Sequence, residues 1–149
     1  MTFSFSTLAR SLADYLAPDL PDATFYEDPN QQNTRCPCVF LQQRFARAAP
    51  YPGGRWLRRI GVDLVYLEEY NLPDLQRRYQ AAAEKLDQLL GTFPYTDPQG
   101  QTALLRALER RWDIDLEGLH YSFELKIWAA RPCDGPPMQS IQQFEEELR

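Results

Sequence analysis

The 149-residue sequence predicts an α+β fold, in which two helices pack on one face of a mostly antiparallel sheet of four to five strands. Two segments repeat their apolar residues at helical spacing, and several others alternate apolar with polar residues as strands do. Such alternation is typical of a sheet with one buried and one solvated face, which favours antiparallel pairing. The length favours a single domain over residues 1–133, followed by a C-terminal arm over 134–149 with a short helical tail.

The two helical segments have recognisable ends. In the first, Ser4 or Ser6 can cap the N-terminus and Pro18 ends the helix. In the second, Asn71 is the expected N-cap and Gly91 the expected left-handed C-terminal cap. The apolar faces are formed by Phe5, Leu8, Ala9, Leu12, Tyr15 and Leu16, and by Leu75, Tyr79, Ala82, Ala83, Leu86, Leu89 and Leu90.

The strand predictions begin with a short strand at Thr24-Phe25-Tyr26. A longer strand over 37–47 places Val39, Leu41 and Phe45 on one face. Residues 48–54 read as a turn-rich connection to a strand over 55–67, which together form a long hairpin. The clearest alternation runs from Leu119 to Ala129, with its odd-numbered residues on the apolar face. Residues 102–114 fit either a helix or a strand.

Charge and composition restrict the function. The net charge of −5 and the isoelectric point of about 4.9 argue against general binding to nucleic acids or anionic membranes. Apolar runs are too short for a membrane-spanning helix, and the first residues do not resemble a secretion signal. The basic residues are 14 arginines and 2 lysines, a bias that suits interface contacts and is a mild indication of assembly.

Residues with metal-binding chemistry give two weak patterns. Cys36, Cys38, Cys133 and His120 could supply four zinc ligands, but an odd cysteine count without an export signal favours free thiols. We therefore expect a metal-free protein without a cofactor, with His120 facing solvent. Separately, Asp63, Asp113 and Asp115 could form a magnesium-dependent nuclease site, although solvated turn residues are the more common explanation.

Five sequence blocks, in order, resemble the tail-terminator proteins of phages and prophages. Residues 25–28 (FYED) look like the family's first short strand, and residues 37–41 (PCVFL) look like its "PCFFI" block. Arg55-Trp56-x-Arg58 followed by residues 62–66 (VDLVY) resembles "R-Y-x-R … F-D-I-x-Y-F". Residues 83–90 (AEKLDQLL) are similar to "AEKLYELL", and 117–121 (EGLHY) to "DGVLHFF". The resemblance favours a strand over 108–114.

This resemblance implies a structural protein of the virion tail, assembled in the cytoplasm of a bacterial host. Such proteins form a ring, usually hexameric, that caps the tail tube, stops its polymerisation and offers a surface for joining the head. The implied partners are copies of the same chain, the tube protein, a head-completion protein and DNA passing through the channel. No catalytic residue is implied. The alternative is a cytosolic interaction module that is monomeric or dimeric.

Candidate assembly contacts lie in three places. An intersubunit ion pair at Asp63 is one, with a partly exposed surface charge as the equal alternative. The arginines around the hairpin loop form the second, unless they are simply solvated. The C-terminal arm is the third, unless its own domain covers it. The hairpin and arm residues are Arg44, Arg47, Arg55, Arg58 and Arg59, and Met138, Ile141, Phe144 and Leu148.

Overall fold

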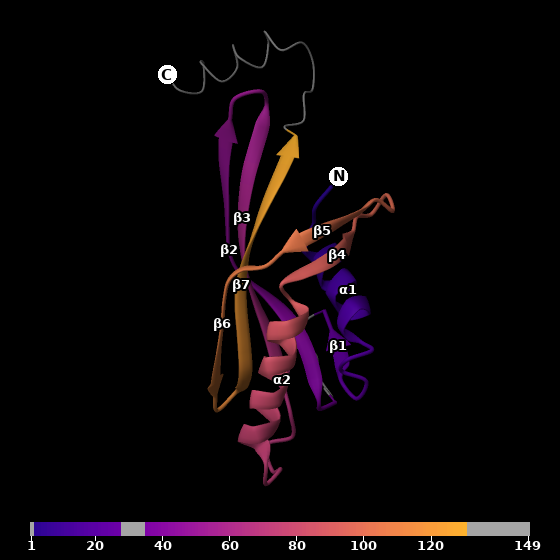
Figure 1. Ribbon diagram of the computed structural model, residues 1–149, viewed down its shortest axis with the longest axis vertical. Helices are drawn as coiled ribbons and strands as arrows, with labels where there is room; N and C mark the ends of the chain where they lie inside the picture. The colour runs from indigo at the N-terminus through magenta and orange to yellow at the C-terminus, as the bar shows by residue number, and fades with distance from the viewer. Residues whose placement is uncertain (1, 28–34, 131–149) are drawn as a thin grey trace.

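The α+β prediction is confirmed by a computed structural model, which describes residues 2–27 and 35–130 (Figure 1). Two helices accompany a five-stranded sheet and a separate two-stranded sheet. The predicted C-terminal arm and its helical tail lie outside the described residues. The elements are α1 (Phe5–Leu16), β1 (Thr24–Tyr26), β2 (Cys38–Tyr51), β3 (Arg55–Leu67), α2 (Leu75–Leu89), β4 (Thr92–Thr96), β5 (Thr102–Arg106), β6 (Leu108–Asp115) and β7 (Gly118–Ala130).

The large sheet has the strand order β1-β2-β3-β7-β6. It is mixed, because β1 pairs with β2 in parallel while the other three pairs are antiparallel. The long β2–β3 hairpin and the β6–β7 hairpin lie next to one another through the β3–β7 pair. Each edge strand is shorter than its neighbour, so the ends of β2 and β7 extend past β1 and β6.

Helix α1 begins as the sequence predicts. The Ser4 side chain caps it by accepting a hydrogen bond from the Thr7 N–H at 3.3 Å. Its buried face consists of Leu8, Leu12 and Leu16, which recur at a spacing of four residues.

Helix α2 is present, but both of its predicted caps are wrong. Asp74 is the N-cap, because Asn71 belongs to a preceding turn that the Leu72 N–H closes on the Glu69 carbonyl. Gly91 does not adopt a positive φ, and the C-cap is Leu90, whose N–H bonds to the Leu86 carbonyl. The Gly91 carbonyl instead accepts from Ala107, at the base of the β4–β5 hairpin.

The ambiguous segment at 102–114 consists of two strands, β5 and β6, so its helical reading is wrong. Strand β5 pairs with β4, and this hairpin buries Phe93, Tyr95 and Leu105. Burial of these large side chains overrides the helical propensity of the segment. A strand over 108–114, which the family resemblance favours, is present as β6.

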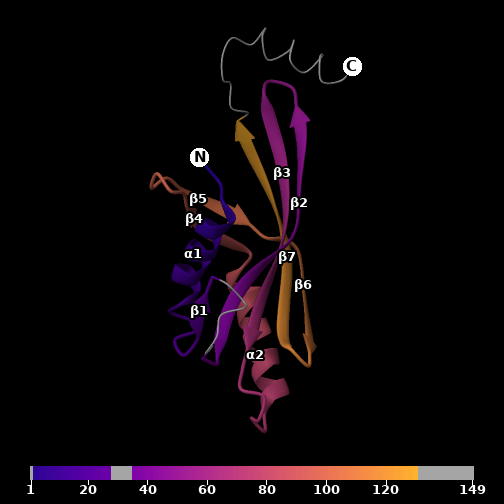
Figure 2. The ribbon, with the colours of Figure 1, turned by 180° about the vertical axis from the view of Figure 1, so that it is seen from behind.

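The core lies between one face of the large sheet and the layer made of α1, α2 and the β4–β5 hairpin (Figures 1 and 2). The Asp87 carboxylate of α2 accepts hydrogen bonds from Tyr121 Oη at 2.7 Å and Trp112 Nε1 at 3.3 Å. These bonds fix α2 over β6 and β7. We call the covered face of the sheet the inner face and the other the outer face.

Candidate assembly surface

The three central strands extend beyond the helices as a three-stranded projection, whose base still contributes Ile60, Leu125 and Ile127 to the core (Figure 1). We define the projection as residues 44–61 and 124–130. Its length follows from the pairing: β1 reaches only Phe40 on β2, and β6 reaches only Glu124 on β7. Beyond those points β2, β3 and β7 have only each other as partners within the described residues.

The projection is longer than predicted, because β2 continues to Tyr51 and pairs it with Arg55. Residues 48–54 were expected to form a connecting turn, but only residues 52–54 do so, with Gly53 and Gly54 at φ +86° and +72°. Pro50 is compatible with the strand because β2 is an edge strand here. An edge strand has a neighbour on one side only, so a proline, which has no N–H to donate, is tolerated in it.

A β-bulge at the base of the projection reverses one predicted side-chain direction. Leu41 pairs with Leu64 on the inner face, whereas Phe45 pairs with Gly61, on the outer face. The prediction that Val39, Leu41 and Phe45 share a face is therefore wrong. A Cβ atom on Gly61 would lie 2.2 Å from Phe45 Cε2, so the ring occupies the space that glycine leaves open.

The hairpin arginines are brought together only in part. Arg47 and Arg59 are direct partners on the outer face, and Arg55 lies on the same face nearer the tip. Arg58 lies on the inner face, where its guanidinium contacts the Phe3 carbonyl at 3.4 Å and the Phe3 ring. Arg44 is at the bulge, with its guanidinium 5.8 Å from the Phe45 ring centre.

Each outer-face arginine also has a partner in its own chain. Arg59 forms an ion pair with Glu124 at 2.8 Å. The guanidinium of Arg47 lies 5.2 Å from the ring centre of Phe45, and that of Arg55 lies 4.9 Å from the ring centre of Trp128. These cation–π contacts hold the charges over aromatic rings and leave guanidinium N–H groups open to a partner.

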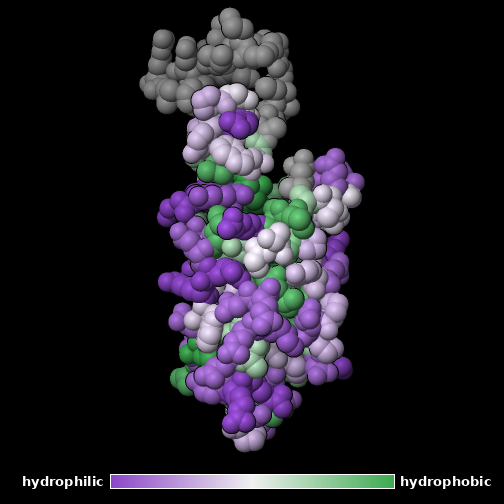
Figure 3. Space-filling model, viewed as in Figure 1, coloured by the Kyte–Doolittle hydropathy of each residue, from purple (hydrophilic) through white to green (hydrophobic). Residues whose placement is uncertain are grey.

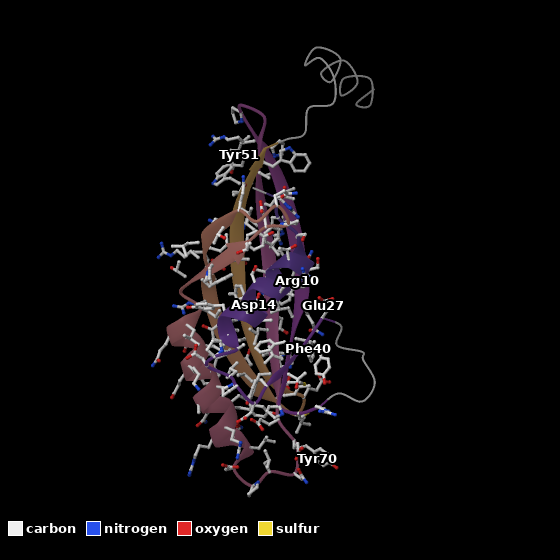
Figure 4. All side chains as sticks on the ribbon, turned by 90° about the vertical axis from the view of Figure 1, so that its right-hand side faces the viewer. Arg10, Asp14, Glu27, Phe40, Tyr51 and Tyr70 are labelled. Atoms are coloured by element: carbon white, nitrogen blue, oxygen red, sulfur yellow. The ribbon has the colours of Figure 1, made fainter. Side chains whose placement is uncertain are left out.

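Sequence reasoning missed the exposed aromatic pair at the tip. Tyr51 and Trp128 meet edge to face with ring centres 5.0 Å apart, although they are 43% and 50% exposed. Figure 4 places Tyr51 near one end of the molecule, opposite Tyr70. A signal was present, since Trp128 continues the even-numbered polar series of Ser122, Glu124 and Lys126.

Asp63 belongs to a network within its own chain, so a partly exposed surface charge does not describe it. The residue is 8% exposed, and its carboxylate contacts His120 Nδ1 at 3.0 Å and Ser122 Oγ at 3.3 Å. His120 was expected to face solvent only, yet it also lies between Asp63 and Asp115, whose Oδ2 is 3.4 Å from Nε2. Burial lowers the pKa of His120, but Asp63, Asp115 and Glu117 outweigh it and raise the pKa overall.

Among the described residues, neither Cys36, Cys38 and His120 nor Asp63, Asp113 and Asp115 form a cluster of converging ligand atoms. Asp113 is the strand partner of His120, but the side chains whose ligand atoms converge are those of Asp115, Glu117 and His120. Cys38 is buried, and its burial together with Cys36 raises the pKa of its thiol to about 12. A thiol with that pKa stays protonated at neutral pH.

The remaining candidates lie outside the described residues. They are Cys133 and the four apolar residues of the C-terminal arm, Met138, Ile141, Phe144 and Leu148.

A scan of protein-family models and a search of curated proteins find no match to this chain. Within the described residues, no helix has the length and apolar character needed to cross a membrane.

Proposed function

We propose that the protein is a tail-terminator-like structural subunit that forms a closed homohexameric ring. In this proposal the ring caps a phage or prophage tail tube, ends tube polymerisation and presents the surface that joins the head. The protein is then part of the virion tail, assembled in the host cytoplasm, and acts without catalysis or a cofactor.

The projection is the observation that carries this proposal. It exposes two aromatic side chains, Tyr51 and Trp128, beside arginines on a sheet that no helix covers. Tyrosine, tryptophan and arginine are the residues enriched in protein interfaces and in their energetic centres. Figure 3 also shows hydrophobic surface around the base of the projection, whereas the surface over α2 is mainly hydrophilic.

The order of the motif blocks gives further support. The blocks that resemble the family fall on β1, the start of β2, β3, the second half of α2 and the start of β7. They therefore cover the framework of the fold and not one local element.

The proposed partners are copies of this chain, the tube protein and a head-completion protein, with DNA passing through the channel. Repeated head-to-tail contacts between identical subunits close into rings when the rotation permits it. A projection that points away from the body is suited to such contacts because it reaches past the subunit's own core.

Light scattering tests the proposal, on the protein alone and with tail-tube protein added. Six copies of 17.4 kDa give a ring of about 104 kDa. Electron microscopy of the mixture should show the protein at tube ends and tubes of limited length. A protein that stays monomeric or dimeric under both conditions, and leaves tube growth unchanged, would favour the interaction module instead.

A triple variant tests whether the projection is the contact. Replacing Arg47, Arg55 and Arg59 with Gln should leave the monomer folded and weaken assembly. The matched control replaces three exposed arginines far from the projection, Arg10, Arg35 and Arg77, and removes the same charge. Equal assembly of both variants would show that the arginines of the projection are merely solvated.

A further inference from the structure

The C-terminal arm begins at the exposed tip of the projection. Strand β7 ends at Ala130, which pairs with Arg55 directly after the hairpin turn. Residues 131–149 therefore start three positions after Trp128, and Tyr51 contacts that same ring. The nineteen residues 131–149 are therefore attached beside the exposed aromatic pair.

The projection and the arm have opposite charges. The projection carries six basic residues and a single acidic one, Glu124, although the whole chain has a net charge of −5. Glu124 is already paired with Arg59. Residues 134–149 contain Asp134 and the run Glu145-Glu146-Glu147 against one arginine. Carboxylates that approach the projection would meet guanidinium groups held over aromatic rings, which suits charge-assisted hydrogen bonds.

The arm and the projection also have apolar surfaces that could pack on each other. The spacing of three, three and four residues between Met138, Ile141, Phe144 and Leu148 predicts one apolar face if the segment is helical. A helix of this length is marginal in water and needs that face covered. The outer face of the projection offers Trp128 and Tyr51 as exposed apolar area, with arginines around them.

We propose that the C-terminal arm, residues 134–149, of a second copy of this chain docks on the outer face of the projection. This inference rests on the proposed function, since it names the contact through which neighbouring subunits join. Its apolar face packs on Tyr51 and Trp128, while Glu145, Glu146 and Glu147 pair with Arg47 and Arg55.

The prolines favour docking of the arm on the projection of a second copy over docking on the projection of its own chain. Pro132, Pro136 and Pro137 favour extended backbone, which advances about 3.1 Å per residue. Eight residues from 131 to Met138, if extended, can reach about 25 Å from Ala130. Tyr51 and Trp128 lie beside the start of the arm, so an extended arm would place its apolar face beyond its own aromatic pair and within reach of a second copy.

Charge reversal in the full-length chain tests this docking by sedimentation. One variant is E145R/E146R/E147R, and the other is R47E/R55E, at two exposed positions of the projection. Each alone should weaken self-association by about tenfold or more, because like charges face each other. An equal mixture should restore association, since the acidic arm of one variant matches the basic projection of the other. The matched control R10E/R77E should associate like the wild type.

The outcomes separate this inference from the proposed function. A mixture that stays dissociated would show that each arm covers its own projection, and variants that assemble like the wild type would show that the arm docks elsewhere. A wild-type chain that is monomeric at all concentrations would also overturn the inference. In each of these cases capping of tube ends, seen by electron microscopy, can still succeed. Conversely, restored association without capping refutes only the proposed function.

Discussion

Replacing Asp63 with alanine tests whether this carboxylate holds the subunit itself together. The residue is 8% exposed, and its side chain has two hydrogen-bond partners, His120 and Ser122. A hydrogen bond involving a charged group contributes about 1.5–3 kcal/mol, and a weaker one about 0.5–1.5 kcal/mol. Because water can reach the partly exposed His120, we expect a loss of about 2–4 kcal/mol in the free energy of unfolding. In a chain of this size that lowers Tm by about 5–15 °C.

Urea unfolding of D63A at low protein concentration measures this loss without a contribution from assembly. D113A is the matched control, because Asp113 is exposed and is the strand partner of His120. We expect D113A to stay within about 0.5 kcal/mol of the wild type, as surface substitutions do. The reasoning fails if D63A unfolds like D113A. If D63A then also loses self-association, Asp63 is an intersubunit contact after all.

Three further predictions concern the rest of the network, the bulge and the arm. The pKa of His120 is raised in the folded state, so the protonated side chain stabilises the fold. In urea unfolding, the wild type should therefore exceed H120Q in free energy of unfolding by the full amount below about pH 6.5, and the difference should disappear as the pH rises through the folded pKa. A pH-independent difference would contradict this. G61A should lower the free energy of unfolding by about 1–3 kcal/mol, because the added Cβ displaces the Phe45 ring. In F45A/G61A the two losses should be strongly non-additive, and additive losses would mean that the two residues do not contact. Truncation after Cys133 should leave the thermal transition unchanged and disrupt the ring, whereas an unfolded monomer would place the arm in the core.

Local patterns predicted the elements whose burial depends on their own residues. Leu8, Leu12 and Leu16 form the buried face of α1, and the odd-numbered residues of β7 are buried from Leu119 to Ile127. The direction of Phe45 was not predictable from β2, because the bulge depends on Gly61 of the neighbouring strand. A bulge adds one residue to the strand, so the residues after it point to the face opposite to the one that strict alternation predicts.

The candidate site shows the same division between local and long-range information. The sequence places the arginines around the hairpin, since strand pairing alone brings their positions together. The contacts of Asp63 with His120 and of Tyr51 with Trp128 join residues 57 and 77 positions apart, and no local pattern reports such pairs. The β4–β5 hairpin was missed for a related reason, because Phe93 and Tyr95 owe their burial to packing against other elements.

The open edges of the projection have a consequence for how the protein avoids fibres. Within residues 35–130, the projection leaves one edge of β2 and one edge of β7 unpaired, and each could add strands from other molecules and propagate a stack without limit. Pro50 removes a donor from the first edge, and Arg44 and Arg47 bring positive charge to it, while Lys126 does the same for the second. Prolines and charges on an edge are the usual protection against such stacking. Recognition is thereby transferred from the backbone, which pairs with any strand, to side chains that accept only a matching surface.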